Sequence, residues 1–297
     1  MDNDMWIGVV TVTFNSGRVI RPFIDSVKRQ TGSLYTVYVV DNASSDDTLA
    51  ALAEYGDLSF KVIKNINNLG VAEGNSQGID AAIHDGCDYI LLLNNDVEFG
   101  PTLFRDLLDG LTVYSCDMIV PKMYYFDDPN RIWCAGGEFK RLRGYAPVHF
   151  GEGDVDQGQF DVARPIEYCP TCCMLIKRQV FDKIGGMDPK YFVYWDDTDF
   201  CFRALKANIC MYYLPTTKLW HKVSSLTGGT TSLFSLYYYT RNKVYFLLKN
   251  RPLYESLCHL VFYWIYILVI PIFGPTTWTK YRERQKAFFA GIALFIV

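Results

Sequence analysis

The segment Tyr194–Asp199 is the feature of the sequence most suited to acid–base chemistry. It places three carboxylates within four residues, directly after a run of aromatic side chains. Mutual repulsion among the acids would raise the pKa of one carboxyl group, and a neighbouring aromatic wall would raise it further. A raised pKa suits a general base. The alternative is a helix N-terminus, where acidic side chains complement the helix dipole. Both roles fit if Asp199 serves the helix and Asp197 serves the chemistry.

A second candidate site is Asn94-Asn95-Asp96, which directly follows the apolar run Tyr89–Leu93. A carboxylate at the C-terminal end of a parallel strand can hold a hard divalent cation that also binds phosphates. Such an ion would neutralise the charge that builds up on a departing nucleoside diphosphate. A single Asp after a strand is common, so this prediction depends on the groups that accompany it.

Three further features give weaker signals. Asp41 follows an apolar run and could accept a hydrogen bond from a nucleobase or cap the next helix, although Ser44 or Ser45 could provide that cap instead. The glycines of Asn68–Asn75 would let backbone N–H groups approach a ligand. His221 follows an expected strand, and a lone histidine is more often a packing or surface residue than a ligand.

The elements that must position these residues alternate between strand and helix over the first 110 residues. The expected strands are Trp6–Phe14, Thr36–Val40, Phe60–Lys64 and Tyr89–Leu93, and the expected helices are Val19–Gln30, Asp47–Tyr55, Gly70–Asp85 and Pro101–Tyr114. This alternation predicts an α/β fold with a mostly parallel, doubly wound sheet. Because ligands bind beyond the carboxyl ends of such strands, Asn15, Asp41 and Asn94–Asp96 should converge on one crevice.

The second half of the chain has a less regular pattern. Between 117 and 168 we expect short strands and a loop at Gly151–Gly158, which is rich in glycine and aspartate. Beyond 168 the pattern becomes regular again, with strands and helices expected at Cys172–Lys177, Arg178–Ile184, Thr198–Ala207 and Cys210–Leu214.

The C-terminal part of the chain differs in composition. Residues 241–297 carry eight basic and two acidic side chains, whereas the whole chain has a net charge of −3. The 17 residues of Leu257–Phe273 are apolar or aromatic apart from His259, which is short for a span of about 20 residues. An anchor lying in the membrane plane is an equal alternative, and the basic residues near Ala287–Val297 suit anionic headgroups. The remaining alternative is a helix pair that covers the catalytic domain.

Overall composition excludes some partners. The chain of 297 residues is 50% hydrophobic and only 21% charged, so neither disorder nor nucleic-acid binding is indicated. The nine cysteines lack a second cluster at zinc-ligand spacing. Their odd number and the absence of a signal-peptide pattern favour a reducing cytosol, with the thiols acting as small packing residues.

Taken in order, five segments resemble glycosyltransferase family 2, which has the Rossmann-like GT-A fold. They are VTVTFN, VVDNASSDDT, NLGVAEGN, YILLLNNDV and YFVYWDDTDFCFR, and they lie within residues 6–222. The similarity is greatest to the rhamnosyltransferase and galactofuranosyltransferase branch. It implies a catalytic domain at 1–228, with a nucleotide-sugar-binding half at 1–115 and an acceptor-binding half at 116–228. A helical region at 229–297 would then attach to the membrane.

The resemblance also implies roles for donor-site residues. Asp41 would contact the nucleobase, and residues 11–15 would line the nucleotide pocket. Asp96 matches the last Asp of the family's Asp-X-Asp motif, whereas Asn94 replaces the first, so the metal would have one carboxylate fewer. His221 lies where related enzymes have a histidine that completes the metal shell, and Asp96 and His221 would therefore hold Mg²⁺ or Mn²⁺. The implied donor site comprises Thr11, Phe14, Asn15, Asp41, Asn68, Gly70, Asn75, Asn94, Asn95 and Asp96.

On the acceptor side, Asp197 matches the family's general base, and Asp196 stands where Glu is more usual. Trp195 would form a wall of the acceptor pocket, with Tyr194 and Cys173 nearby. The implied reaction is a single displacement. Asp197 takes the proton from an acceptor hydroxyl, whose oxygen attacks the anomeric carbon and inverts it as the nucleoside diphosphate leaves.

The sequence leaves the substrates open. By resemblance alone the first choice of donor is dTDP-rhamnose, and UDP-galactofuranose, UDP-galactose and UDP-GlcNAc are the alternatives. The expected acceptor is a lipid-linked or polysaccharide glycan for the cell surface, at the inner face of the plasma membrane. A homodimer is an open alternative to a monomer.

Two other functions compete with glycosyl transfer. A nucleotidyltransferase would need a glycine-rich, basic loop after the first strand, and VTFNSGRVIRPF lacks that density. A non-catalytic sugar-binding protein would agree with Asn94 in place of Asp, but the acids at 196, 197 and 199 argue against it.

Overall fold

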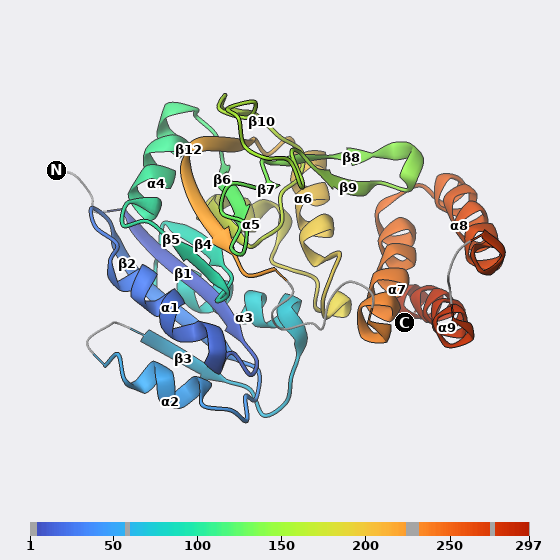
Figure 1. The fold of residues 1–297 in the computed structure, drawn as a ribbon, viewed down its shortest axis with the longest axis horizontal. Coiled ribbons are helices and arrows are strands. Elements are labelled where there is room, and N and C mark those ends of the chain that lie inside the picture. Colours follow the sequence, from blue (N-terminus) through green and yellow to red (C-terminus); the bar gives the residue numbers. More distant parts are fainter. Residues whose placement is uncertain (1–4, 57–59, 224–231, 274–276, 297) are drawn as a thin grey trace.

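Ten strands form one mixed sheet at the centre of the computed structural model, which describes residues 5–56, 60–223, 232–273 and 277–296 (Figure 1). At one side of the sheet four strands run parallel, namely β1 (Trp6–Thr13), β2 (Leu34–Asp41), β3 (Phe60–Lys64) and β4 (Tyr89–Leu93). The antiparallel β11 (Cys173–Lys177) joins β4 to β6 (Met118–Tyr125), which pairs in parallel with β12 (Met211–His221). Short strands complete its margins: β5 (Val97–Phe99), β7 (Ile132–Cys134) and β10 (Arg164–Pro165).

Helices cover the sheet, as a parallel sheet requires. They are α1 (Gly17–Lys28), α2 (Thr48–Ala53), α3 (Gly70–His84), α4 (Leu103–Val113), α5 (Arg178–Ile184) and α6 (Asp196–Lys206). Helix α3 packs on β1, β2 and β4, and α4 packs on β6 and β12. A Cβ at Gly74 of α3 would come within 2.7 Å of Val12 of β1, so glycine allows this close packing. The predicted α/β class with a mostly parallel sheet is confirmed.

Strand β12 is much longer than the predicted Cys210–Leu214. The predicted strand ends directly before Pro215, a residue that has no N–H to donate to a sheet. In the structure the pairing with β6 shifts register between Leu214 and Lys218, so the proline lies at an irregularity and the strand continues to His221. This extension carries a candidate metal ligand to the edge of the site.

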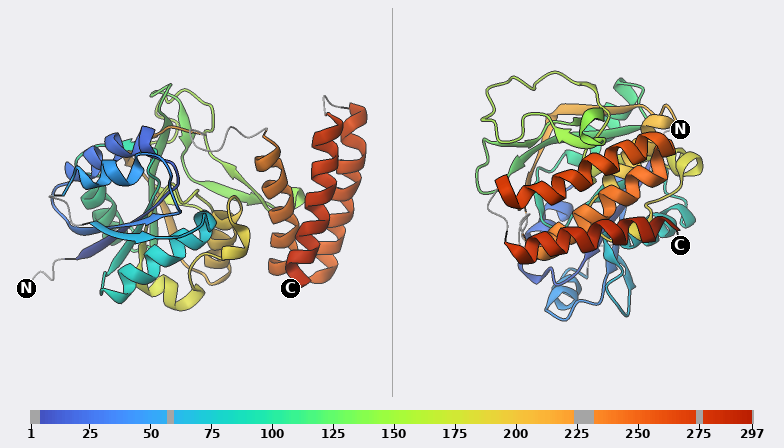
Figure 2. Two further views of the ribbon diagram at one scale, coloured as in Figure 1. Left: turned by 90° about the horizontal axis from the view of Figure 1, so that it is seen from below. Right: turned by 90° about the vertical axis from the view of Figure 1, so that its right-hand side faces the viewer.

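The C-terminal helical region consists of α7 (Leu233–Asn250), α8 (Leu253–Phe273) and α9 (Trp278–Ile296), which lie side by side beside the α/β part (Figure 2). Helix α7 packs closely along α9 and lies within the helical region predicted at 229–297, although the sequence analysis gave no separate helix there. Of the described helices, α8 alone is long and apolar enough to cross a membrane, judged by length and composition. Only 17% of its apolar window, Leu253–Ile270, is buried. The predicted domain boundary at 228/229 lies outside the described residues.

The remaining elements connect these parts. A two-stranded hairpin of β8 (Gly137–Lys140) and β9 (Ala146–His149) extends toward α7, with the short 3₁₀ helix Arg141–Arg143 at its tip (Figure 1). A second 3₁₀ helix, Pro189–Tyr191, precedes α6. All nine cysteines are free thiols and seven are buried, as expected for packing residues.

Candidate active site

The two acids predicted to do chemistry lie in the first turn of α6. Asp196 is buried, and the half-buried Asp197 accepts hydrogen bonds from the Tyr168 hydroxyl (2.8 Å) and the backbone N–H of Thr198 (2.6 Å). Burial and the charge of Asp197 raise the pKa of Asp196 to about 8. Burial also raises the pKa of Asp197, but hydrogen bonds from Tyr168 and from the N–H and hydroxyl of Thr198 act in the opposite direction. Asp197, whose carboxylate is stabilised by these hydrogen bonds, is therefore the member of the pair better suited to act as a base.

Tyr168 belongs to a row of aromatic rings that no sequence motif indicated. His149 stacks on Tyr168 with ring centroids 5.7 Å apart, and Trp133 contacts His149 edge-on at 5.4 Å. These residues come from the irregular region 117–168, from short strands and connecting segments that bear no local motif. Their proximity to Asp197 arises from long-range pairing alone.

The hydroxyl of Tyr168 leads to a prediction about pH. In Tyr168→Phe the Asp197 carboxylate loses a donor that lowers its pKa, so the pKa of Asp197 rises. A base acts only when ionised, so the acid limb of the kcat/KM profile should move to higher pH. We expect transfer at neutral pH to fall about tenfold, since a hydrogen bond to a charged group is worth about 1.5–3 kcal/mol.

The matched control for this prediction is Tyr213→Phe. The Tyr213 hydroxyl is also buried but donates to the backbone carbonyl of Phe160, away from Asp197. The control should leave the pH profile in place. An identical shift in both variants, or none in Tyr168→Phe, would contradict the role assigned to the hydroxyl.

The predicted metal ligands Asp96 and His221 are brought together by the sheet. Asp96 precedes β5, which pairs antiparallel with the end of β12, and Val97 lies opposite His221 in the register. His221 Nε2 lies 3.1 Å from Asp96 Oδ1, and each side chain is at least nine-tenths buried. The extension of β12 beyond Pro215 is therefore what creates this pair.

The chemistry of this pair fits a divalent cation. Carboxylate oxygen and imidazole nitrogen are both ligands of Mn²⁺, and the carboxylate also suits Mg²⁺. In the described parts of the chain, no group of three or more His, Cys, Asp and Glu side chains is arranged to hold a metal ion. The protein would thus contribute two ligands here, and a diphosphate would have to supply others.

The metal pair and the base are connected through the row of rings. Trp133 contacts His221 with ring centroids 4.3 Å apart, and on its other side it contacts His149. From His149 the row continues to Tyr168 and then to Asp197. Two candidate centres from distant parts of the sequence therefore belong to one continuous site.

The strand ends on the donor side converge as predicted. Thr13 of β1 donates to Asp41 of β2 (2.8 Å), and Asn95 after β4 donates to the Val12 carbonyl (2.6 Å). The backbone N–H of Asn15 donates to Ser44 across the same junction. The ends of β1, β2 and β4 thus meet at one edge of the sheet.

The structure corrects the proposed cap of α2. Ser44 does not cap the helix, because its hydroxyl donates to Asp41 Oδ1 (2.6 Å) and its N–H to Asp41 Oδ2 (3.0 Å). Helix α2 begins at Thr48, whose N–H donates to Asp46. With three donors on its carboxylate, the buried Asp41 holds the ends of β1 and β2 together. Its contact with a nucleobase stays a prediction.

The interpretation of Asn68–Asn75 as a ligand-binding turn needs correction at its first residues. The N–H groups of Val71 and Ala72 at the start of α3 both point at the Phe192 carbonyl, at 2.6 and 3.4 Å. A Cβ at Gly70, where φ is +86°, would lie 2.4 Å from the same oxygen. Asn68 accepts a hydrogen bond from the N–H of Gly70 (2.9 Å). This turn therefore binds the segment before α6 rather than presenting free N–H groups to a ligand.

Other predicted site residues differ in how accessible they are. Phe14 and Asn15 are exposed and Asn94 is half-buried, whereas Thr11 and Asn75 are buried. Cys173 was predicted on the acceptor side, but it is 0% exposed in the middle of the sheet, paired with Leu93, so it is a packing residue.

The predicted acceptor wall at Trp195 is also covered. Trp195 is 2% exposed and packs against Tyr239 and Phe246 of α7. The hydroxyl of Tyr194 lies 2.9 Å from that of Ser235, also on α7. Tyr239 is 47% exposed, and partial burial, followed by the charge of the nearby Asp197, raises its pKa. The exposed aromatic surface near the base thus includes α7, which the sequence interpretation had not assigned.

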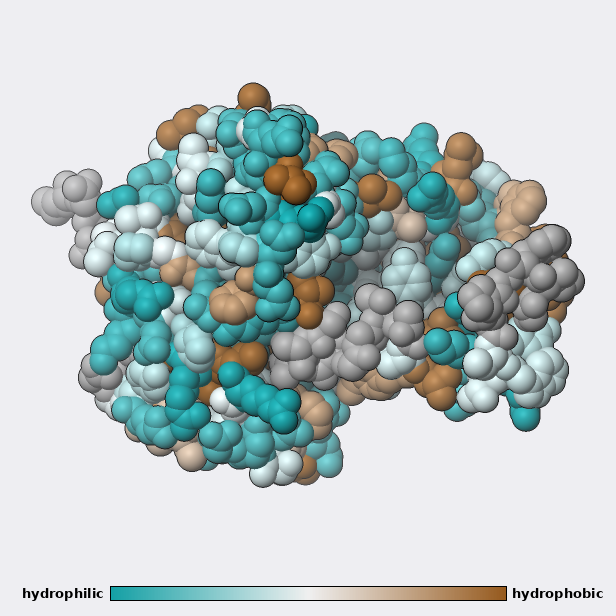
Figure 3. Space-filling view, viewed as in Figure 1, coloured by the Kyte–Doolittle hydropathy of each residue, from teal (hydrophilic) through white to brown (hydrophobic). Residues whose placement is uncertain are grey.

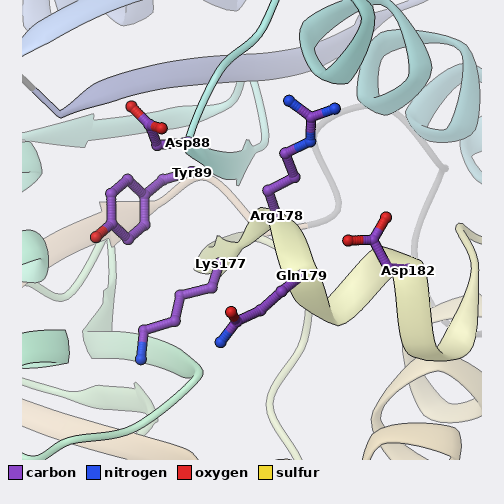
Figure 4. Close-up of a pocket in the computed structure, with 6 residues that line it drawn as sticks. All are labelled: Asp88, Tyr89, Lys177, Arg178, Gln179 and Asp182. Atoms are coloured by element: carbon purple, nitrogen blue, oxygen red, sulfur yellow. The ribbon is translucent and has the colours of Figure 1, made fainter.

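A separate cavity of about 450 Å³ lies at the start of β4, lined by Asp88, Tyr89, Lys177, Arg178, Gln179 and Asp182 (Figure 4). Its position is at the opposite end of β4 from Asn94, and the side chains of Lys177 and Arg178 point away from each other. This cavity is therefore not part of the site that holds Asp96 and Asp197.

The fold and the site together define a class of protein. The mostly parallel α/β sheet has a GT-A-like fold, and the carboxylate–histidine pair lies at its strand ends, where such sheets bind their ligands. The chain belongs to glycosyl transferase family 2, whose sequence profile matches residues 8–185. The family predicted from the ordered motifs is thus confirmed.

Two curated relatives and one solved structure are similar to the chain. N-acetylglucosaminyl-diphospho-decaprenol L-rhamnosyltransferase of Mycobacterium tuberculosis is 26% identical over 238 residues, covering 74% of this chain and 77% of the relative. The dTDP-rhamnosyl transferase RfbF of Shigella flexneri is 24% identical over 275 residues, covering 89% and 88%. GalNAc-T7, solved with UDP, GalNAc and Mn²⁺, shares the fold with a TM-score of 0.63 at 14% identity, over 99% of this chain and 57% of its own.

Proposed function

We propose that this glycosyltransferase is metal-dependent and inverting, and that it transfers rhamnose from dTDP-rhamnose to a hydroxyl of a lipid-linked or polysaccharide acceptor. Two relatives named as rhamnosyltransferases support the choice of sugar. The main support for the reaction is the continuous row from the Asp96–His221 pair to Asp197. This row of contacts supports a direct displacement, in which a metal-bound diphosphate and a base act on the same anomeric carbon.

In this mechanism each residue has a defined task. Asp197, held by Tyr168 and the N-terminus of α6, takes the proton from the acceptor hydroxyl. The acceptor oxygen then forms a bond to the anomeric carbon from the side opposite the leaving group, and the bond to the diphosphate oxygen breaks. Asp96 and His221 would hold Mg²⁺ or Mn²⁺, which stabilises the negative charge on the departing diphosphate. One displacement inverts the anomeric centre.

Two measurements test this function. A thermal-shift screen of dTDP, UDP and GDP, each with and without Mn²⁺, should show the largest stabilisation for dTDP with metal. NMR of the product formed from dTDP-rhamnose and a soluble prenyl-diphosphate-GlcNAc acceptor should show the anomeric configuration opposite to that of the donor. A preference for UDP would move the donor to the alternative sugars, and retained configuration would exclude the single displacement.

We further propose that residues 1–228 form the catalytic domain and that the region from about 250 to 297 binds the cytoplasmic face of the membrane. Large apolar side chains of α8 are exposed, among them Leu257, Val261, Phe262 and Ile265. Figure 3 shows hydrophobic side chains on this end of the molecule among polar ones. The adjacent α9 carries Lys280, Arg282, Arg284 and Lys286, which suit anionic headgroups.

The membrane proposal predicts the behaviour of a charged variant. Val261→Glu/Phe262→Glu places two carboxylates on the exposed side of α8, where both side chains are more than half exposed. Cosedimentation with phosphatidylglycerol-containing vesicles should fall at least tenfold, since each apolar side chain removed from water contributes about 1.5–3 kcal/mol. The control Val113→Glu/Val162→Glu adds the same charge at exposed positions elsewhere. Equal binding by both variants would contradict membrane contact through α8.

A further inference from the structure

The segment Tyr191–Trp195, which leads into the two candidate catalytic acids, has an unusual backbone. Phe192, Tyr194 and Trp195 have φ values of 66°, 62° and 67°, a region that residues other than glycine rarely occupy. At Phe192 the backbone makes a γ-turn, with the N–H of Val193 donating to the Tyr191 carbonyl (2.8 Å). Such conformations persist only where the surroundings impose them, and they cluster at functional sites.

One side chain supplies most of this constraint. The amide Nδ2 of Asn242, on α7, lies 2.8 Å from each of three carbonyl oxygens, those of Tyr191, Val193 and Tyr194. Asn242 is 0% exposed. The neighbouring Arg241 donates to the Tyr191 carbonyl as well (2.7 Å).

The carbonyl of Phe192 instead contacts the turn on the donor side. The Phe192 oxygen accepts from the N–H of Val71 at the start of α3, whose glycine-rich turn begins beside the ends of β2 and β3. The Asn42 side chain after β2 donates to the Gly70 carbonyl (2.9 Å). The segment is thus held by α7 on one side and by the donor-side turn on the other. Because the segment leads directly into α6, these two sets of contacts determine the direction in which α6 begins.

We propose that Asn242 is a positioning residue for Asp197, which fixes the strained Tyr191–Trp195 backbone and thereby aims the base at the acceptor hydroxyl. This inference rests on the proposed function, in which Asp197 is the base. The chain passes from Trp195 directly into Asp196 and Asp197, so a rotation of the strained peptides would move both carboxylates. Helix α7 then belongs to the catalytic apparatus, although it lies outside the family's matched residues 8–185.

The same helix provides a matched control. Asn250 is also a buried asparagine of α7, and its Nδ2 donates to Asp199 Oδ1 (2.8 Å). Asp199 in turn binds Arg203, Lys249 and the hydroxyl of Tyr191, so this contact ties α6 to α7 through side chains only and involves none of the backbone carbonyls of the segment. Removing the Asn250 amide therefore costs a comparable buried hydrogen bond but leaves the Tyr191–Trp195 carbonyls with their donor.

The experiment compares full-length Asn242→Ala, Asn250→Ala, Asp197→Asn and the double variant Asp197→Asn/Asn242→Ala. Hydrogen–deuterium exchange should rise in the peptide covering 189–200 for Asn242→Ala and not for Asn250→Ala. With dTDP-rhamnose and the soluble acceptor, kcat per folded molecule should fall about 100-fold for Asn242→Ala, because small misplacements of a reacting group cost that much. The donor KM should change less than threefold, and Asn250→Ala should keep kcat within threefold of the parent protein.

The outcomes separate this inference from the proposed function. If Asn242 acts through Asp197, the double variant is no slower than Asp197→Asn alone. Unchanged exchange at 189–200, an unchanged kcat or equal losses in both alanine variants would overturn the positioning role and leave the base assignment intact. Full activity of Asp197→Asn would instead overturn the proposed base, whatever the exchange data show.

Discussion

Asp197→Asn is expected to lower kcat by about 10²–10⁴-fold, because this is the contribution that a general base typically makes. The asparagine has nearly the same shape, so the hydrogen bond with Tyr168 and the start of α6 can persist. Binding of dTDP with Mn²⁺, measured by calorimetry, should stay within about threefold of the parent protein. A loss of kcat with unchanged dTDP affinity would show that the variant impairs proton transfer and leaves the donor site intact.

The matched variant is Asp196→Asn. Because burial and its neighbour raise the pKa of Asp196 to about 8, this residue is protonated at neutral pH, and an asparagine amide resembles its protonated form. Its effect on kcat should therefore be far smaller than that of Asp197→Asn. A larger loss at Asp196 would transfer the role of base to that residue, and a parallel loss of dTDP affinity in Asp197→Asn would remove the assignment.

Local sequence patterns predicted those parts of the site that lie on regular elements. The strand run Tyr89–Leu93 fixes the place of Asp96, and the acids of Asp196–Asp199 indicate both a helix start and a reactive group. His221 was found by resemblance, but its distance from Asp96 depends on the irregular pairing of β12 around Pro215. No local pattern describes that irregularity.

The residues that sequence reasoning missed act through single long-range contacts. Tyr168, His149 and Trp133 lie in short connecting segments, and nothing near them in sequence indicates that they meet Asp197 or His221. Asn242 is one of several polar residues of α7, and its importance follows from three carbonyls that lie about 50 residues away in the chain. The turn at Gly70 was interpreted as a ligand-binding turn for a related reason. Its N–H groups bind the backbone carbonyl of Phe192, and sequence motifs do not reveal a contact between two backbone segments.

Asp96→Ala is expected to remove the effect of metal on nucleotide binding. In the parent protein, Mn²⁺ should raise the affinity for dTDP, because the cation would be held by Asp96 and His221 and would also bind the diphosphate. Without the carboxylate, calorimetric titrations with and without Mn²⁺ should coincide. We expect kcat/KM to fall about 10²–10³-fold, since charge stabilisation by a metal is worth several kcal/mol.

His221→Ala should show a weaker loss of metal dependence than Asp96→Ala. The control is His84→Ala, which changes an exposed histidine at the end of α3, far from Asp96.

Asn94→Asp tests the metal site by adding a ligand instead of removing one. It restores the carboxylate that this chain lacks in its Asp-X-Asp position, at the half-buried end of β4. A third anionic ligand should tighten Mn²⁺ binding, so less metal would saturate the enzyme. If the dependence on Mn²⁺ persists in Asp96→Ala and is unchanged in Asn94→Asp, the cation binds elsewhere.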